Sequence, residues 1–395
     1  MKLTFYSNFI NHHQIPLCLE FYKALGDEFK FVVTEQVPEE RLAMGYRDLS
    51  ELYPFIVKAY LSESEYEYAR LLGEESDVVI IGSAPEEFVR LRICRNKLTF
   101  RYSERVFKKG RWLVLYPVKL FKLLRNHTLY RSKNVYLLGA SAYAASDFLL
   151  VGAYKNKAYT WGYFPEVKEY PIDVLMHKKN NDIPKILWVG RFIALKHPEL
   201  MISLAKRLKE NGFTFSLDLI GTGPLQAKLK KCISKYRLEN EVTILGSMSP
   251  EEVRSHMEQA NIFLFTSNYL EGWGAVLNEA MNSGCAVVAS HAIGSVPVLL
   301  KNNENGLIYT YRNNQQMFDS VVSLLNNPDK CRRFGRKAYT TLVETWNPAK
   351  AAERFIVLAS SLLNGKEVMY EDGPCSKAKL LTHAYGKTIT RNNGT

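Results

Sequence analysis

The chain has 395 residues, of which 47% are hydrophobic, 23% are charged and 12% are aromatic, and its formal net charge is +12. This composition excludes a disordered, collagen-like or coiled-coil protein, and the length exceeds that of one typical domain. The six cysteines form no CxxC pair and no zinc motif, which indicates reduced thiols rather than a secreted disulfide scaffold.

Twelve short β-rich segments alternate with helical stretches. They are residues 2–7, 29–34, 77–83, 97–103, 134–139, 157–163, 185–191, 215–221, 241–246, 261–267, 285–290 and 306–311. Most are continuous apolar runs, which are typical of parallel strands covered by helices on both faces. Because the alternation occurs twice, we expect an α/β fold with two Rossmann-like doubly wound domains facing across a cleft.

The polar, proline-containing stretch in the middle of the chain predicts a boundary between these domains. We expect a first domain over residues 1–165, a linker over 166–184 and a second domain over 185–347. A helix is expected at about 348–365 and a loose polar tail over 366–395. The N-terminus has no apolar leader and no run of eighteen apolar residues occurs, so we expect a cytoplasmic protein without a membrane-spanning helix.

The most informative window is FTSNYLEGWGAVLNEAMNSGCAVVAS, in which a strand, a glycine-containing loop and a helix beginning near Ala275 follow one another. Gly272 and Gly274 allow a ligand to approach the backbone closely, and a helix N-terminus attracts anions. If wholly helical, the E-x7-E spacing of Glu271 and Glu279 separates them by about 12 Å, similar to the distance from a hexose to a ribose across a diphosphate. The alternative is an ordinary strand–loop–helix unit with a solvated acid.

A second window, VGRFIALKHPEL, places two cations after a strand that ends at Gly190. Arg191 and Lys196 are suited to gripping a diphosphate, the arginine in bidentate fashion and the lysine as a point charge. The alternative is a pair of surface cations.

A third window, LIGTGPLQAKL, predicts a tight turn at Gly221 and Gly223 and a helix with Pro224 in its first position. Together with the end of the next strand, this turn is a candidate wall for a nucleobase. The candidates on that strand end are Gly246, Ser247 and Met248.

The order of these windows resembles the retaining nucleotide-sugar glycosyltransferases of the group 1 class, which have the GT-B fold. The resemblance covers residues 185 to about 310. It implies that Arg191 and Lys196 neutralise the donor pyrophosphate, that Glu271 faces the transferred sugar and that Glu279 binds the ribose. His197 stands where the family usually has glycine after the lysine.

The resemblance also implies that the first domain binds the acceptor, the second binds the donor, and the final helix crosses back to the first domain. Backbone N–H groups of Gly274 and Ala275 then lie near the sugar. The remaining donor-site candidates are Gly190, Gly221, Gly223, Gly246, Ser247, Met248, Gly272, Trp273 and Val276.

The function expected on this basis is retaining transfer of a hexosyl unit from a UDP- or GDP-sugar to a saccharide or lipid-linked saccharide. The product would belong to a capsule, O-antigen or exopolysaccharide. No DxD motif lies near these strands, so we expect neither a metal nor another cofactor. The alternatives are a nucleotide-sugar epimerase on the same fold and a nucleic-acid- or membrane-binding protein with a basic patch.

Polar residues at two strand ends of the first half are candidates for the acceptor side. Asn11, His12 and His13 follow the first strand, and Ser103 and Glu104 end a later one. Histidine can bind phosphate or hydroxyl groups, whereas the alternative is a cluster that caps the next helix. Glu104 has the further alternative of an ion-pair partner.

The positive charge is concentrated in the basic segment, defined as residues 90–133, which holds fourteen Lys and Arg against the single acid Glu104. Aromatic residues are interleaved with these cations. Such a surface suits an anionic bilayer, which would make the protein peripheral at the inner face of the plasma membrane. Binding of nucleic acid is not expected, because no known nucleic-acid-binding motif accompanies the charge.

Overall fold

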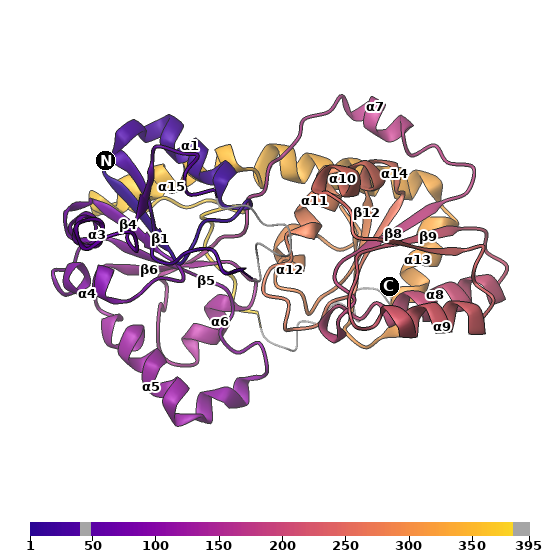
Figure 1. The fold of residues 1–395 in the computed structure, drawn as a ribbon, viewed down its shortest axis with the longest axis horizontal. Coiled ribbons are helices and arrows are strands. Elements are labelled where there is room, and N and C mark those ends of the chain that lie inside the picture. Colours follow the sequence, from indigo (N-terminus) through magenta and orange to yellow (C-terminus); the bar gives the residue numbers. More distant parts are fainter. Residues whose placement is uncertain (40–48, 382–395) are drawn as a thin grey trace. The chain divides into compact units, whose positions relative to one another are not determined.

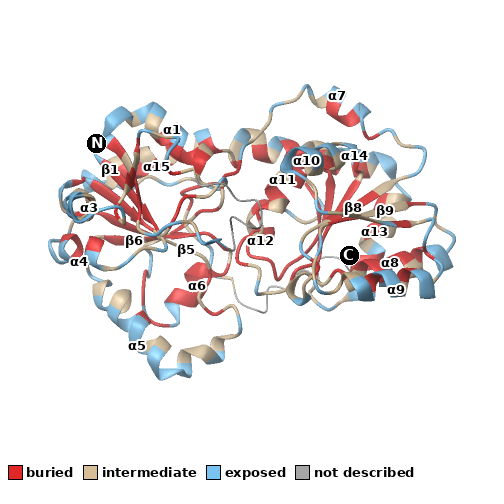
Figure 2. Cartoon of the chain, in the orientation of Figure 1, coloured by how far each residue is buried: buried red, intermediate tan, exposed pale blue. Residues whose placement is uncertain are grey.

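The computed structural model describes residues 1–39 and 49–381, and its chain divides into two compact units. The first unit is Met1–Glu166 with Trp346–Leu380, and the second includes Val167–Thr345. Each contains one parallel sheet whose strands lie buried between helices (Figures 1 and 2). Within the described residues, no helix combines the length and apolarity needed to cross a bilayer.

The sheet of the first unit has seven parallel strands in the order β3-β2-β1-β4-β5-β6-β7. They are β1 (Leu3–Ser7), β2 (Phe29–Val33), β3 (Ile56–Lys58), β4 (Val78–Ile81), β5 (Thr99–Ser103), β6 (Val135–Gly139) and β7 (Ala158–Thr160). All residues of β1 and β4 are buried, as expected for central parallel strands.

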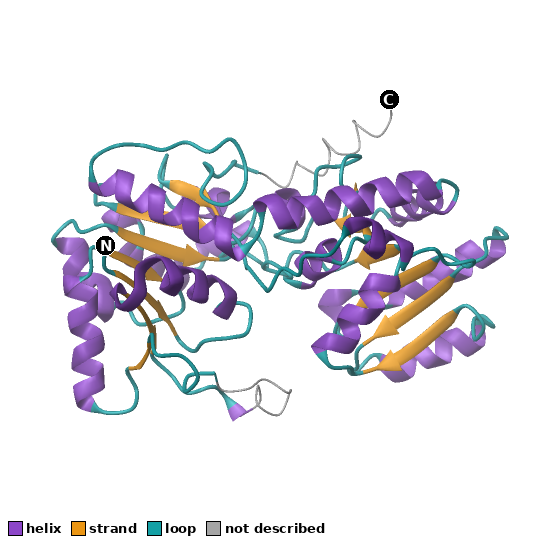
Figure 3. Ribbon diagram, turned by 90° about the horizontal axis from the view of Figure 1, so that it is seen from above, coloured by secondary structure: helices purple, strands orange, loops and turns teal. Residues whose placement is uncertain are grey.

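Helices cover this sheet on both sides (Figure 3). They are α1 (Ile15–Leu25), α3 (Glu63–Glu75), α4 (Glu87–Cys94), α5 (Pro117–Asn126), α6 (Ala144–Leu149) and α15 (Pro348–Leu363). The last helix begins where the Asn347 side chain accepts the Lys350 N–H. Its Phe355 packs edge-on against Phe21 and Phe100, so this late segment completes the core of the first unit.

The sheet of the second unit has six parallel strands in the order β10-β9-β8-β11-β12-β13. They are β8 (Lys185–Val189), β9 (Ser216–Ile220), β10 (Val242–Gly246), β11 (Ile262–Phe265), β12 (Ala286–Ser290) and β13 (Leu307–Tyr309). Both sheets therefore follow the doubly wound strand order. The first three strands are added toward one edge of the sheet, and the fourth strand lies on the other side of the first.

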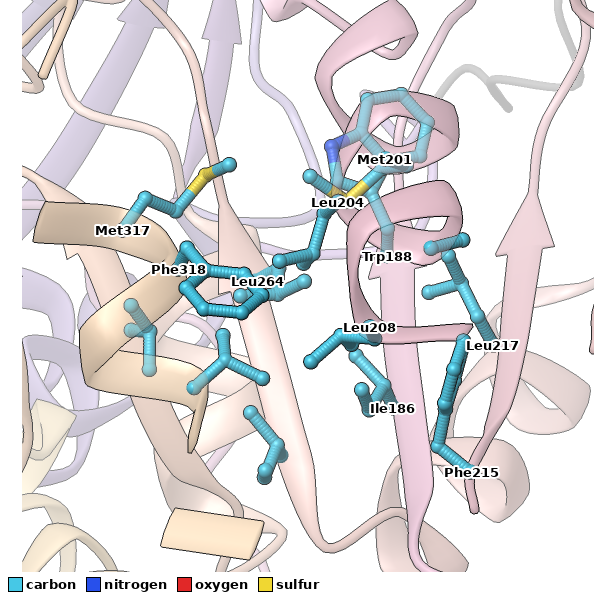
Figure 4. Close-up of a cluster of buried hydrophobic side chains, with 14 of the residues drawn as sticks. Ile186, Trp188, Met201, Leu204, Leu208, Phe215, Leu217, Leu264, Met317 and Phe318 are labelled. Carbon is cyan, nitrogen blue, oxygen red and sulfur yellow. The ribbon is translucent and has the colours of Figure 1, made fainter. Parts of the chain in front are cut away.

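The helices of the second unit are α7 (Ile172–His177), α8 (Glu199–Glu210), α9 (Gln226–Lys235), α10 (Pro250–Gln259), α11 (Val276–Asn282), α12 (Val296–Leu299), α13 (Asn314–Leu325) and α14 (Pro328–Thr340). Side chains of β8, β9, β11, α8 and α13 form one apolar cluster (Figure 4). Trp188 and Met201 lie within it, which fixes α8 against the strand that precedes the candidate site.

The predicted α/β class with two doubly wound sheets is confirmed, and each of the twelve expected segments contains a strand. The edge strand β3 was not expected, because its three residues are too short to show a pattern. Pro224 does not start a helix, since α9 begins at Gln226 and Leu225 occupies its N-cap.

Two segments expected to lack structure are packed. The expected linker contains α7, whose Leu175 and Met176 are buried in the second unit. In the expected tail, Cys375 N–H donates to the Thr160 carbonyl and Thr160 N–H donates to the Ser376 carbonyl, which extends the sheet beyond β7. The prediction of a loose tail is therefore wrong for the paired residues, and residues 382–395 lie outside the described ones.

Candidate active site

The strand order of the second sheet brings the first two sequence windows to one place. β8 and β11 are hydrogen-bonded neighbours, and the connections that leave them run to opposite sides of the sheet. In doubly wound sheets this switch point, at the carboxyl ends of the strands, is where ligands bind. The loops that follow β8 and β11 carry Arg191 and Lys196 on one side and Glu271 on the other.

Lys196 and Glu271 form an ion pair, with 2.5 Å between Nζ and Oε2. Both side chains are mostly buried, and the Lys196 ammonium lies 5.7 Å from the centre of the Phe265 ring. The Lys196 carbonyl accepts the Thr266 hydroxyl at 2.7 Å. The pair is therefore held by contacts with β11 and the residue after it. Arg191, in the same loop as Lys196, is exposed.

His197 fixes the backbone that follows Lys196. Its φ of 52° is in the left-handed region, which residues other than glycine rarely adopt. One ring nitrogen lies 2.8 Å from Glu199 Oε1, and the other lies 3.3 Å from both the Asn268 amide and the Tyr311 hydroxyl. These contacts tie three loops together at the site. Sequence reasoning assigned no role to them, because strand and helix periodicity do not reveal contacts between distant loops.

Close backbone contacts join the ends of β8, β9 and β10. Gly221 N–H donates to the Gly246 carbonyl at 2.7 Å, and a Cβ at Gly221 would lie 2.0 Å from the Gly190 oxygen. A Cβ at Gly223 would lie 2.7 Å from the Phe192 oxygen. The structure therefore brings the predicted positions Gly190, Gly221 and Gly246 together, and only glycine permits the close approaches at Gly221 and Gly223. A Cβ at Gly246 would meet no atom within 4 Å.

The other nucleobase candidates and the start of the glycine loop lie at the same strand ends. Ser247 is exposed, and Met248 is partly exposed. In the loop after β11, Gly272 is buried and Gly274 has a φ of 85°. A Cβ at Gly274 would lie 2.4 Å from the Phe265 ring, so this glycine is needed for packing.

The side chain of Trp273, which the sequence analysis expected at the donor site, is buried inside the second unit. It is 0% exposed, and its indole N–H donates to Asn278 Oδ1 at 3.0 Å. Ala275 is the N-cap residue of α11, and Val276 is its first residue. Trp273 therefore anchors the loop to α11 from inside the unit. In the sequence, a tryptophan between two glycines is consistent with contact to a donor and with packing inside the unit. Only the burial of its side chain distinguishes these two roles.

Glu279 lies on α11 and is partly buried. Burial raises the pKa of its carboxyl group, and the nearby positive charge of Arg254 opposes this shift. Since α11 begins only at Val276, the segment from Glu271 to Glu279 is not wholly helical, and the helical estimate of the separation between the two acids does not apply.

The acceptor candidates of the first unit gather around a residue that the sequence did not indicate. The rings of His12 and His13 lie 3.8 Å apart, and the His13 ring stacks on Tyr163 with 6.2 Å between centres. The Tyr163 hydroxyl donates to Glu104 Oε1 at 2.7 Å. Asn11 Oδ1 accepts the His13 N–H at 3.0 Å. Residues from the ends of β1, β5 and β7 therefore form one polar cluster.

Of the two alternatives for these residues, the structure shows the ion pair of Glu104 but no side-chain cap at the N-cap of α1. Glu104 forms an ion pair with Lys108, and the Ser103 hydroxyl donates to the Glu104 carbonyl at 2.8 Å. The α1 N-cap, Gln14, makes no side-chain capping bond. Burial, together with the positive charge of His12, lowers the pKa of His13 to about 3, so the His13 ring is neutral at physiological pH.

The basic segment is less open than its sequence indicates, because three of its arginines are buried. Arg92 donates to four backbone carbonyls. Arg101 pairs with Glu86 through contacts of 2.6 and 2.7 Å, and Arg105 pairs with Asp147 through two contacts of 3.2 Å. These groups stabilise the first unit and are not available to a partner.

Comparison with known proteins finds a family match within the second unit. Residues 175–341 match the model of the family "Glycosyl transferases group 1". The chain is 35% identical over 127 residues to the amylovoran biosynthesis glycosyltransferase AmsK of Erwinia amylovora, covering 31% of each chain. It is 29% identical to the N-acetylgalactosamine-N,N'-diacetylbacillosaminyl-diphospho-undecaprenol 4-alpha-N-acetylgalactosaminyltransferase of Campylobacter jejuni, covering 42% of this chain and 44% of that one.

The matches to curated relatives span between 31% and 44% of those proteins' length. Over a larger part, the fold is similar to that of Anabaena HepE, solved in complex with UDP, with a TM-score of 0.68 and 15% identity. That likeness covers 91% of this chain and 100% of HepE. Residues 175–341 therefore match the glycosyl transferases group 1 family, and the two doubly wound sheets of this chain have the GT-B fold.

Proposed function

We propose that this protein is a glycosyltransferase that moves a hexosyl unit from a nucleotide diphosphate sugar, a UDP- or GDP-sugar, to a saccharide or lipid-linked saccharide acceptor, with retention of anomeric configuration. The observation that carries the proposal is the Lys196–Glu271 ion pair at the switch point of the second sheet, with the exposed Arg191 in the same loop as Lys196. Two cations and one carboxylate at this position match the charges and hydroxyl groups of such a donor.

The donor diphosphate is assigned to Arg191 and Lys196, and the hexose hydroxyl groups to Glu271. Lys196 then exchanges part of its contact with Glu271 for a phosphate oxygen. The ends of β9 and β10 at Gly221 and Gly246 would border the nucleobase, because a side chain at Gly246 would point into open space. Glu279 is assigned to the ribose hydroxyl groups. UDP in the complex of HepE supports this class of donor.

The reaction breaks the bond between the anomeric carbon and the diphosphate oxygen and forms a bond from the same carbon to the acceptor oxygen. The leaving diphosphate gathers negative charge, which Arg191 and Lys196 stabilise from fixed positions. A phosphate oxygen takes the acceptor proton on the face that the diphosphate leaves, so the configuration is retained. This scheme requires neither a protein nucleophile nor a cofactor, because the two cations supply the positive charge.

The acceptor is assigned to the polar cluster of His13, Tyr163 and Glu104 in the first unit. Neutral imidazole, phenol and carboxylate groups are suited to binding saccharide hydroxyl groups. The names of two relatives support the class of product: one acts in amylovoran biosynthesis, and the other on a saccharide linked to diphospho-undecaprenol. We therefore propose a role in cell-surface polysaccharide assembly.

The test is acceptor-dependent release of nucleotide from UDP- and GDP-sugars by wild type and by Glu271→Gln. Because Glu271 is assigned to hold the hexose in position for transfer, its replacement should lower kcat about 100-fold or more. Glu304→Gln, which changes an exposed acid of the same unit, serves as the matched control. Undiminished turnover in Glu271→Gln contradicts the assigned role.

The same assay separates the rival functions. An epimerase converts the nucleotide sugar without releasing nucleotide, whether or not an acceptor is present. A nucleic-acid-binding protein binds DNA in a salt-dependent manner and has no affinity for nucleotide sugars. The burial of Arg92, Arg101 and Arg105 weighs against the latter, since it removes three cations from the surface.

A further inference from the structure

The remaining open part of the basic segment is an apolar surface edged with cations. Five large side chains between Gly110 and α5 or on α5 itself are 58% to 80% exposed, although they are hydrophobic. Together with the exposed cations around them they form what we call the α5 surface: Trp112, Leu115, Tyr116, Val118, Phe121, Lys109, Lys122 and Arg125.

Helix α5 has one face that packs against the first unit and one face that is exposed. Leu123 is buried and Leu120 packs against the core of the first unit. On the outer face, Val118 and Phe121 are three residues apart, and Lys122 and Arg125 each lie four residues after one of them. Residues at these spacings are neighbours on a helix, so two apolar and two cationic side chains share one outward face. Figure 2 shows α5 mainly in the colours of exposed and intermediate residues.

The charge of this surface has one sign. No Asp or Glu occurs between Arg105 and Asp147 in the sequence, and the nearest preceding acid, Glu104, is paired with Lys108. Lys122 and Arg125 are exposed, unlike Lys119, whose ammonium donates to the Val106 carbonyl. Exposed Trp, Tyr, Phe and Leu side chains edged with Lys and Arg are typical of helices that lie in the interface of an anionic bilayer.

We propose that the α5 surface docks the first unit on an anionic phospholipid membrane. Val118, Phe121 and the residues just before α5 enter the headgroup region, while Lys122 and Arg125 contact lipid phosphates. The proposal rests on the proposed function only for its purpose, which is to bring the enzyme to an acceptor held at a membrane.

One tryptophan makes the proposal directly measurable. All five tryptophans lie within the described residues, and Trp112 is 62% exposed whereas the others are at most 5% exposed. Accessibility of tryptophan fluorescence to an aqueous quencher therefore reports on the α5 surface. With vesicles of phosphatidylcholine and phosphatidylglycerol at low salt, we expect a blue shift, protection from acrylamide and quenching by brominated lipid. Trp112→Phe removes this signal but retains vesicle binding.

Variants divide the electrostatic from the apolar contribution. Lys122→Gln/Arg125→Gln should bind the anionic vesicles about 25-fold more weakly, since each cation contributes about a fivefold effect. Val118→Ser/Phe121→Ser should weaken binding at least about tenfold and abolish the blue shift. Lys228→Gln/Lys231→Gln on α9, which removes two exposed cations of the second unit, is the matched control and should leave binding unchanged.

Several outcomes overturn the proposal. They are absence of vesicle binding at low salt, equal binding to vesicles of phosphatidylcholine alone, and equal weakening by the α9 control. Concentration-dependent dimerisation that protects Trp112 without lipid would assign the surface to a second copy, and DNA binding without vesicle binding would assign it to nucleic acid. Binding of UDP- and GDP-sugars without lipid, measured on the same variants, shows separately whether the proposed function fails.

Discussion

Replacement of Gly221 tests whether the close approach of β8 and β9 shapes the candidate site. Gly221 has a φ of 133°, and an added Cβ would lie 2.0 Å from the Gly190 oxygen, a backbone atom that cannot rotate away. The unfavourable φ costs about 1–2 kcal/mol, and a forced backbone shift about 1–3 kcal/mol more. We expect Gly221→Ala to reduce the free energy of unfolding of the second unit by about 2–5 kcal/mol.

Gly212→Ala is the matched control. Gly212 also has a positive φ, 75°, but an added Cβ there would meet no atom within 4 Å. We therefore expect Gly212→Ala to reduce the free energy of unfolding only through the unfavourable φ, by about 1–2 kcal/mol. The additional steric cost of about 1–3 kcal/mol should make the melting temperature of Gly221→Ala about 3–9 °C lower than that of Gly212→Ala. Donor affinity should fall only for Gly221→Ala, and melting temperatures within about 2 °C of each other would refute the steric argument.

Three further predictions concern single side chains. Arg105→Met should reduce the free energy of unfolding by about 3–5 kcal/mol, because it leaves the fully buried Asp147 carboxylate without its counter-charge; a loss below about 1 kcal/mol in urea unfolding contradicts this. His197→Ala should cost about 1–2 kcal/mol in thermal unfolding by removing its polar contacts, whereas His197→Asn should cost less, since Asn tolerates a positive φ; the reverse order disproves the argument. Because burial raises the pKa of Glu279, donor affinity in calorimetric titrations should fall as the pH is lowered toward that pKa, and Glu279→Gln should be insensitive to the same change; identical pH profiles exclude Glu279 from ribose binding.

The fold was predictable because each strand can be recognised from its own short run of residues. Continuous apolar runs such as 262–265 identify buried parallel strands, and glycines at their ends identify the turns. The positions of Lys196 and Glu271 follow from strand order, since residues after neighbouring parallel strands share one sheet edge. Distances within the site did not follow, because the loop before α11 is irregular.

What sequence reasoning missed depends on contacts between distant segments. The Trp273 side chain is buried, and its indole N–H donates to Asn278. Tyr163, which follows another strand, contacts both His13 and Glu104. Charge counting overestimated the basic surface for the same reason: burial of Arg105 beside Asp147 is a tertiary property. Local patterns specify elements, whereas such pairings appear only once the elements are packed.

The most direct measurement of the central claim is calorimetric titration of a panel of UDP-, GDP- and ADP-sugars into wild type, Lys196→Met, Glu271→Gln and the control Glu304→Gln. The account predicts that wild type and Glu304→Gln bind a UDP- or GDP-sugar equally well. The two site variants should bind it at least about tenfold more weakly, since each loses a charge-assisted contact. Absence of binding to every member of the panel, or equal affinity in all four proteins, would contradict the assignment of this sheet edge to a nucleotide sugar.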